Sequence, residues 1–372
     1  MIKGFNQKIR KTKNHSNEIN TFSCNSRKNR IKICSVSNFS GISKKSMTII
    51  FNIIFFNVFS LKYINNNNFE NDYNHIEYDL VIPLHMNDTE KLLRQKDLFK
   101  KYLNYSNLII IIPKNSNEIN QQNSIIFIKE DDLIPKEDLI NIFYKRGIKE
   151  INRVGWYEQQ FLKMSYSRIC DKEYYLLWDA DTIPIRPIKM FDKGVPIFDM
   201  KKEKHFPYFI TLERLIPGLH FTKFSYISEH MIIKTEYMRN ILDIIENNVI
   251  IPGKMFWEKI LASIDQTDIL NSGFSEYETY GTYVDNIYPN AYKHRMWSSK
   301  RNMVHFFGNI DNLIFQDIKW LSKDYYAISF EKWDTFEKNY LKIVTNSELQ
   351  NKCRPKRFFK YFKRIYKKYS RL

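Results

Sequence analysis

The sequence predicts an α/β fold around a mixed β-sheet, because apolar runs long enough for buried strands alternate with a helical pattern. The runs cover residues 78–84, 107–112 and 124–128, and each is followed by a polar or proline-containing segment. Continuous apolar runs of this kind are typical of parallel strands that are covered on both faces. Such strands need helices on the faces of their sheet.

A helix is predicted between the first two runs. Leu92, Phe99 and Leu103 recur on one helical face, behind a cap at Asn87 or Asp88. In sheets that open this way, ligands lie at the carboxyl ends of the strands. Neither G-x-G-x-x-G nor G-x-x-x-x-G-K-[ST] occurs, so a dinucleotide fingerprint and a P-loop are absent.

The composition is that of a folded chain. Of its 372 residues, 43% are hydrophobic and 16% aromatic, which argues against a disordered or collagen-like protein. This length allows one large domain or two smaller ones. The four cysteines are scattered, so neither a disulfide scaffold nor a zinc ribbon is expected.

The formal charge of +17 is concentrated at the two ends of the chain. Residues 1–46 and residues 352–372 carry +10 each, whereas residues 47–351 carry −3. A duplex-binding protein is expected to carry basic groups on its folded body. We therefore predict no specific nucleic-acid partner.

Three segments precede the predicted domain. Residues 1–46 are predicted to be disordered, because they are polar and basic and lack apolar periodicity. Residues 47–64 begin with an apolar run of about fifteen residues behind a basic flank, which is typical of a signal anchor. A core strand or helix of the domain is the alternative for this run. The Asn-rich residues 65–77 are predicted to be a linker.

The C-terminal tail, residues 346–372, interleaves Lys and Arg with apolar and aromatic residues. Phe358, Phe362, Ile365 and Tyr369 recur at helical spacing. This pattern fits an amphipathic helix on an anionic membrane surface, which would make the protein membrane-associated. A helix packed on the domain with a solvated basic face is the second interpretation, and RNA binding is the third.

The most informative feature is a pair of aspartates after a fourth apolar run. Residues 174–178 predict a buried strand, and Asp179 and Asp181 follow at its end. Two carboxylates one residue apart can bind a divalent cation that bridges the phosphates of a nucleotide. The alternative is an Asp-rich turn whose carboxylates cap backbone amides.

Other candidates come from neighbouring segments. In a helix predicted over 156–169, Trp156, Gln160 and Lys163 share one face and could line a ligand-binding cleft. An ordinary half-exposed helix surface is the alternative, and the spacing alone favours it. The apolar face of that helix is predicted to comprise Leu162, Tyr166 and Ile169.

Two glutamates are candidates for a general base on the acceptor side. Glu229 could accept a proton from a hydroxyl, with His230 beside it contacting a phosphate, or it could simply belong to a helix start. Glu276 is preferred to Glu278, because Ser275 followed by Glu278 forms a capping box that explains Glu278 structurally.

These segments resemble a family of glycosyltransferases of the GT-A type, many of whose members have no assigned function. The resemblance rests on the runs YDLVIPLH, GWYEQQFLKM, YYLLWDADTIPIRPI, SEHM and FSEYETYG. It implies one Rossmann-type GT-A domain over residues 78–345, a nucleotide-sugar donor, and Mn²⁺ or Mg²⁺. It places Asp179 near the donor ribose and the metal, puts Asp181 on the metal, and suggests His305 as a further metal ligand.

The predicted function is transfer of a sugar from a nucleotide-diphosphate donor to a hydroxyl of a glycan or lipid-linked acceptor. Asp181 and the metal would hold the diphosphate, Lys163 would add positive charge, and Glu276 or Glu229 would activate the acceptor. The alternatives are a metal-dependent nucleotidyl- or phosphotransferase and a non-catalytic, membrane-associated glycan-binding protein. A Gly-Ser loop before the aspartate pair would favour the first alternative, and none is present.

Overall fold

The structure, a computed structural model, describes residues 19–26, 29–36, 76–84, 89–116, 124–150, 152–331 and 334–369. The chain divides into two compact units, Met1–Asn71 and Asp72–Leu372.

In the first unit, β1 (Ile19–Ser26) and β2 (Asn29–Val36) form an antiparallel hairpin. These strands lie within the segment predicted to be disordered. The alternation of Ile31 and Ile33 with basic residues has the period of a strand and favours this pairing. The predicted signal anchor, 47–64, and nearly all of the predicted linker lie outside the described residues.

The second unit alternates strands and helices, as predicted. Its strands are β3 (Tyr78–Pro83), β4 (Leu108–Ile112), β5 (Ile125–Lys129), β6 (Tyr174–Trp178), β7 (Thr182–Pro184), β8 (Phe191–Asp192), β9 (Val195–Met200), β10 (His230–Lys234), β11 (Lys293–Met296), β12 (Ser299–Lys300) and β13 (Ala327–Ser329). Its α-helices are α2 (Thr89–Tyr102), α3 (Glu130–Leu133), α4 (Lys136–Lys145), α5 (Asn152–Ser165), α6 (Phe206–Leu215), α7 (Thr235–Asn247), α8 (Phe256–Ser263), α9 (Glu276–Ile287), α10 (Val304–Phe307), α11 (Phe315–Leu321), α12 (Lys338–Val344), α13 (Ser347–Lys352) and α14 (Pro355–Tyr369).

The main sheet has the strand order β10-β6-β3-β4-β5. Strands β6, β3, β4 and β5 are parallel, and β10 runs antiparallel to β6. Every residue of β3, β4 and β6 is buried, as their unbroken apolar sequences predict. The prediction of a mixed α/β sheet flanked by helices is confirmed.

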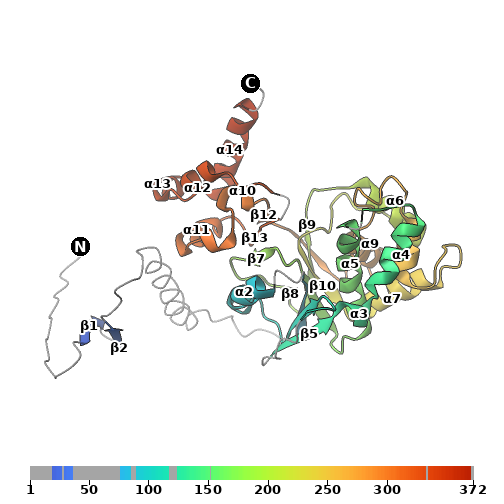
Figure 1. Ribbon diagram of the computed structural model, residues 1–372, viewed down its shortest axis with the longest axis horizontal. Coiled ribbons are helices and arrows are strands. Elements are labelled where there is room, and N and C mark those ends of the chain that lie inside the picture. Colours follow the sequence, from blue (N-terminus) through green and yellow to red (C-terminus); the bar gives the residue numbers. More distant parts are fainter. Residues whose placement is uncertain are drawn as a thin grey trace. The chain divides into compact units, whose positions relative to one another are not determined.

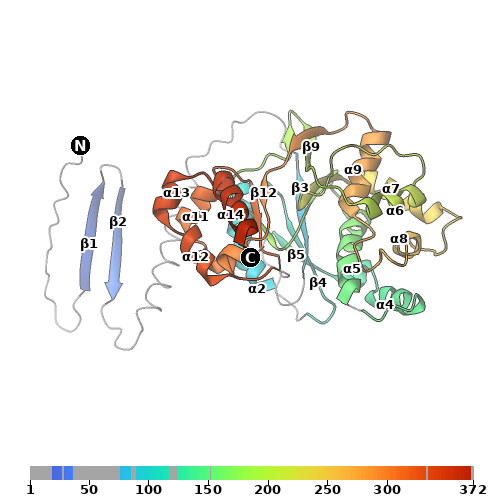
Figure 2. The ribbon, with the colours of Figure 1, turned by 90° about the horizontal axis from the view of Figure 1, so that it is seen from above.

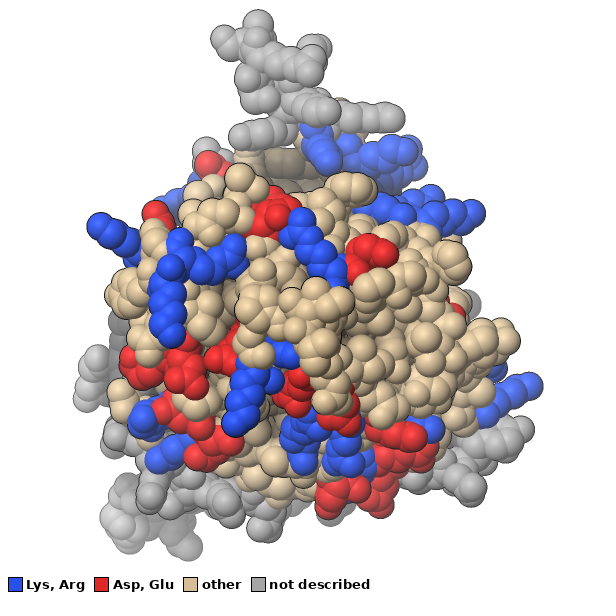
Figure 3. All heavy atoms as spheres, turned by 90° about the vertical axis from the view of Figure 1, so that its right-hand side faces the viewer, with Lys and Arg blue, Asp and Glu red and all other residues tan. Residues whose placement is uncertain are grey.

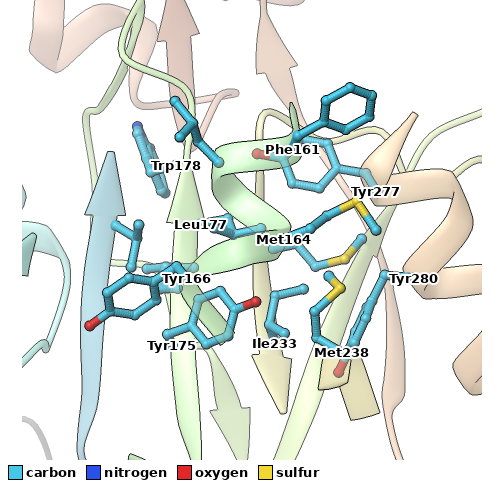
Figure 4. Packing of buried hydrophobic residues seen from close by; sticks show 14 of the residues in the cluster. Phe161, Met164, Tyr166, Tyr175, Leu177, Trp178, Ile233, Met238, Tyr277 and Tyr280 are labelled. Atoms are coloured by element: carbon cyan, nitrogen blue, oxygen red, sulfur yellow. The ribbon is translucent and has the colours of Figure 1, made fainter. Parts of the chain in front are cut away.

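Helices cover the main sheet on two sides. Figures 1 and 2 place α4, α5 and α7–α9 to one side and α10–α14, with β7, β12 and β13, to the other. In Figure 4, Phe161 and Met164 of α5 lie between the strands and the rings of Tyr277 and Tyr280 on α9. Helix α5 is thus packed between the sheet and α9.

Of two predicted helices, the first has the expected buried face and the second has different ends. Leu92, Phe99 and Leu103 are buried, as expected of α2 and the residue after it. Helix α5, however, begins before Trp156 and gives way to a 3₁₀ turn at Tyr166–Arg168. Ile169, predicted to face the core, is therefore 54% exposed.

A second hydrophobic cluster joins β7, β13 and the C-terminal helices. We call it the second cluster, and its buried members are Ile183, Ile185, Met303, Phe306, Phe307, Ile310, Ile318, Trp320, Leu321, Tyr325, Ile328, Phe330, Val344 and Phe359. Because Phe359 of α14 belongs to it, the tail predicted to start at 346 packs on the domain. Among the described residues, no helix is long and apolar enough to cross a bilayer.

Gly281 of α9 provides a test of this packing. A Cβ there would lie 2.2 Å from the ring of Tyr226, so Gly281→Ala is expected to lower the free energy of unfolding by about 1–3 kcal/mol through overpacking. Gly155→Ala is the matched control: this glycine is also helical, but nothing lies within 4 Å of its added Cβ. The control should be neutral or stabilise by up to about 1 kcal/mol. Chemical denaturation of both variants measures the difference, and equal effects would contradict this packing.

Candidate active site

The aspartate pair lies where strand β6 ends. Trp178 is the last residue of β6 and is fully buried. The amide of Asp179 then donates to the carbonyl of Glu229, 2.9 Å away, which extends the pairing of β6 with β10. Glu229 has a φ of 64°, a left-handed conformation that costs a non-glycine residue about 1 kcal/mol or more.

Lys163 connects Asp179 to the predicted base Glu276. Its Nζ lies 2.5 Å from Oδ1 of Asp179 and 2.7 Å from Oε1 of Glu276. The Lys163 side chain is only 3% exposed. Burial acts to lower the pKa of Lys163, but the two carboxylates outweigh it and raise that pKa. Lys163 is therefore a permanently charged, buried partner of two acids.

Tyr277 of α9 and Gln160 of α5 also bind the group formed by Lys163, Asp179 and Glu276. The hydroxyl of Tyr277 donates to Oδ1 of Asp179 at 3.1 Å. Oε1 of Gln160 accepts from the amide of Glu276 at 3.2 Å. Trp156 is half-buried, and the Arg153 guanidinium stacks on its ring at 4.0 Å. The structure thus brings Gln160 and Lys163, which the helical spacing placed on one face of a helix, together with Asp179 and Glu276.

Asp181 has a different environment. Its carboxylate accepts a hydrogen bond from the hydroxyl of Thr182 at 3.1 Å, and no Lys, Arg or His among the described residues forms an ion pair with it. Burial, with further contributions from Asp179 and Glu331, raises the pKa of Asp181 to about 7. Asp181 is therefore a carboxyl group that lacks a positive partner.

Glu229 is held by donors from several segments. Lys201 forms an ion pair with its Oε1. The indole of Trp297 and the hydroxyl of Ser299 donate to Oε2, at 2.9 and 3.0 Å. The Arg301 guanidinium lies 3.9 Å from the carboxylate. These donors fix the orientation of the Glu229 carboxylate. The same contacts help to hold the backbone of Glu229 in its left-handed conformation.

His230 is buried behind the aspartate pair. One ring nitrogen lies 2.9 Å from the carbonyl of Ser228 and the other 3.0 Å from Asp199. Arg295 forms a two-pronged ion pair with the same Asp199, at 2.6 Å for both bonds. Both ring nitrogens are engaged and the residue is 2% exposed, so this arrangement leaves His230 no nitrogen for a phosphate.

His305 lies in the layer of the second cluster. It belongs to the short helix α10, and the Nδ1 atom of His305 lies 3.0 Å from the carbonyl of Thr335. Its ring also packs against Tyr340. Within the described ranges, no three His, Cys, Asp or Glu side chains come together in a group that could hold a metal ion. The structure therefore does not bring His305 to the aspartate pair.

Ser275 caps α9 as predicted, and its Oγ accepts from the amide of Glu278 at 3.3 Å. The carboxylate of Glu278 does not complete the capping box. Its Oε2 binds Ser225 and the amide of Tyr226 instead, and burial raises the pKa of Glu278 to about 7. Glu278 is thus a buried structural acid.

Sequence reasoning missed three charged residues of this region: Lys201, Arg301 and Glu331. Each lies just beyond a strand or its paired extension, after β9, β12 and β13. Arg301 donates to Glu331 at 2.8 Å, and Glu331 is 2% exposed. A charge directly after the mostly apolar run 327–330 could have identified Glu331, whereas Lys201 and Arg301 follow segments that contain polar residues and had no such signal.

The buried pairs of Lys163 can be tested by Lys163→Met. Removing the ammonium leaves two acids without a cationic partner, so we expect the free energy of unfolding at neutral pH to fall by about 3–5 kcal/mol. Lys293→Met is the control, because its ion pair with Asp192 is exposed on both sides and should be worth less than about 1 kcal/mol. Urea denaturation measures both, and a small effect at Lys163 would contradict the described pairing.

Asp181 predicts a pH dependence of stability. The pKa of its carboxyl is near the ordinary value of 3.8 in the unfolded chain and about 7 in the folded protein, so the native state holds the proton more tightly. The destabilising contribution of Asp181 is absent below pH about 4 and grows as the pH rises towards about 7. Asp181→Asn should therefore match the wild type in acid and be more stable by about 1 kcal/mol or more at pH about 8. Denaturant titrations in EDTA at both pH values measure this gap, and a gap that does not widen with pH would contradict the buried, unpaired state.

Comparison with known proteins places the chain in a family. No curated protein matches the sequence. Among solved structures, the galactosyltransferase LgtC in complex with donor and acceptor sugar analogues aligns at 10% identity and a TM-score of 0.33, covering 74% of this chain and 94% of LgtC. An active-site mutant of LgtC aligns at 11% identity and a TM-score of 0.34, covering 74% of this chain and all of that one. The sequence profile of a family of unknown function, DUF6492, matches residues 76–354, and the chain belongs to this family.

Proposed function

We propose that this protein is a metal-dependent glycosyltransferase that moves a sugar from a nucleotide-diphosphate donor to a hydroxyl of a glycan or lipid-linked acceptor. The observation that carries the proposal is the pair Asp179 and Asp181 at the carboxyl end of β6, an interior strand of the main sheet. Ligands of open α/β sheets bind at this edge.

Asp181 fits a divalent cation. A half-buried carboxyl with a raised pKa, and with no basic ion-pair partner among the described residues, gains most from a cation, because the cation replaces the proton and offsets the charge of Asp179 and Glu331. Mn²⁺ or Mg²⁺ bound by Asp181 with Asp179 would neutralise the charge of a departing diphosphate.

The other residues would position rather than react. Lys163 and Tyr277 hold Asp179 at its Oδ1, so Lys163 would act on the donor through Asp179. Gln160 orients the start of α9 at Glu276. Trp156 would offer a flat surface beside this group.

Glu276 and Glu229 remain the carboxylates proposed for the acceptor side. One oxygen of Glu276 accepts a hydrogen bond from Lys163. Burial raises the pKa of Glu276, although Lys163 acts to lower it. A raised pKa makes a carboxylate a better proton acceptor. Both carboxylate oxygens of Glu229 are already engaged, Oε1 by Lys201 and Oε2 by Trp297 and Ser299. Glu276 is therefore the preferred base.

A panel of nucleoside diphosphates and nucleotide sugars with Mn²⁺ tests the proposal. We expect one nucleotide to raise the melting temperature by several degrees and its sugar donor to be hydrolysed slowly. EDTA and Asp181→Ala should abolish both effects. Asp192→Ala is the matched control, because it removes an aspartate that lies exposed on the surface, and it should leave both effects in place.

Two outcomes would contradict the proposal. A lack of response to every diphosphate and sugar donor would remove its basis. Release of pyrophosphate from a nucleoside triphosphate, with no sugar hydrolysis, would instead identify a nucleotidyltransferase.

A further inference from the structure

The last helix, α14, divides its residues between two environments. The rings of Phe358, Phe359 and Phe362 face the second cluster. Phe359 lies 4.8 Å from Phe306, and Phe358 lies 5.4 Å from Trp320. The aromatic stripe that the sequence offered for membrane contact is thus used, along this part of the helix, to hold α14 on the domain.

The opposite side of α14 is basic. Its outer face, as we define it, comprises Lys356, Arg357, Lys360, Tyr361 and Lys363, all exposed. Among the described residues, none of these four cations forms an ion pair. The helix has no Asp or Glu in its sequence, so no acid of its own can neutralise them.

The start of α14 is anchored. The indole of Trp320 donates to the carbonyl of Cys353 at 2.7 Å, and Asp324 accepts from the amide of Lys356 at 3.0 Å. Arg354 forms an ion pair with the same Asp324 at 2.6 Å. The outer face is therefore presented on a fixed helix and not on a loose tail.

We propose that the outer face of α14 docks on an anionic lipid surface while Phe358, Phe359 and Phe362 stay packed in the protein. Lys and Arg near such a surface are attracted to its headgroups, and each contributes independently of sequence. Tyr361, 65% exposed among these cations, has the amphipathic ring that favours the headgroup level. The contact is electrostatic and peripheral.

A lipid surface fits this face better than a nucleic acid does. A duplex would extend beyond one helix and meet the body of the protein, which carries −3 over residues 47–351. The face over α4, α6 and α7, for example, interleaves acids with bases (Figure 3). A planar membrane needs only one exposed basic helix. Docking through this face does not require the proposed transferase activity.

Flotation of the full chain with vesicles tests the inference. The vesicles are phosphatidylcholine alone or phosphatidylcholine with phosphatidylglycerol, in low and high salt. The triple variant K356Q/K360Q/K363Q should bind the anionic vesicles more weakly by about fivefold per charge, or about a hundredfold in total, in low salt. High salt or removal of phosphatidylglycerol should abolish the difference.

The matched control is K145Q/K202Q/K254Q, which removes the same charge from exposed lysines elsewhere. It should bind like the wild type, and the N-terminal segment is identical in all three proteins. Equal weakening in both triple variants would show that only net charge matters, and no weakening in either would show that α14 does not dock. Tighter, equally α14-dependent binding to a random-sequence RNA would also overturn the proposal.

Discussion

The buried ammonium of Lys163 is the interaction on which the candidate site depends. The end of strand β6 and the start of helix α9 both bring a carboxylate to Lys163, one half-buried (Asp179) and one buried (Glu276), and two acids so close to each other repel. Lys163 satisfies both Asp179 and Glu276 from one turn of α5. Because this cation is committed to those two acids, Asp181 is left without one. Asp181 thus differs from Asp179 and Glu276 because it has no cationic partner among the described residues.

The two aspartates are supported by different halves of the molecule. Asp179 is bound to α5 and α9 through Lys163 and Tyr277. Asp181 is bound to the layer of the second cluster: its carbonyl accepts from the amide of Phe330 at 2.8 Å. Thr182 also shares a hydrogen bond of 2.7 Å with Ser329. Asp179 and Asp181 are separated by a single residue but are bound to two different packed clusters. The distance between their carboxylates therefore depends on how these two clusters are placed.

The sequence could predict what depends on neighbours in the chain. The unbroken run 174–178, the cap at Ser275 and the shared helical face of Gln160 and Lys163 are local patterns, and the structure contains each of them. Contacts between distant segments had no such signal. Lys201 and Arg301 resemble many exposed cations until folding brings them to Glu229. His230 was predicted to contact a phosphate, but its partner Asp199 lies on another sheet and engages its ring.

The same junction connects the surface helix to the site. The Nζ of Lys300 lies near the rings of both Phe306 and Phe359, at 5.3 and 4.9 Å from their centroids, and burial lowers the pKa of Lys300 to about 8. Its neighbour Arg301 binds Glu331, which in turn contributes to the raised pKa of Asp181. Packed interiors shift as units rather than deform continuously. A displacement of α14 must therefore shift the residues of the second cluster, and with them the segment that holds Asp181. The packing of α14 and the charges around Asp181 thus depend on each other.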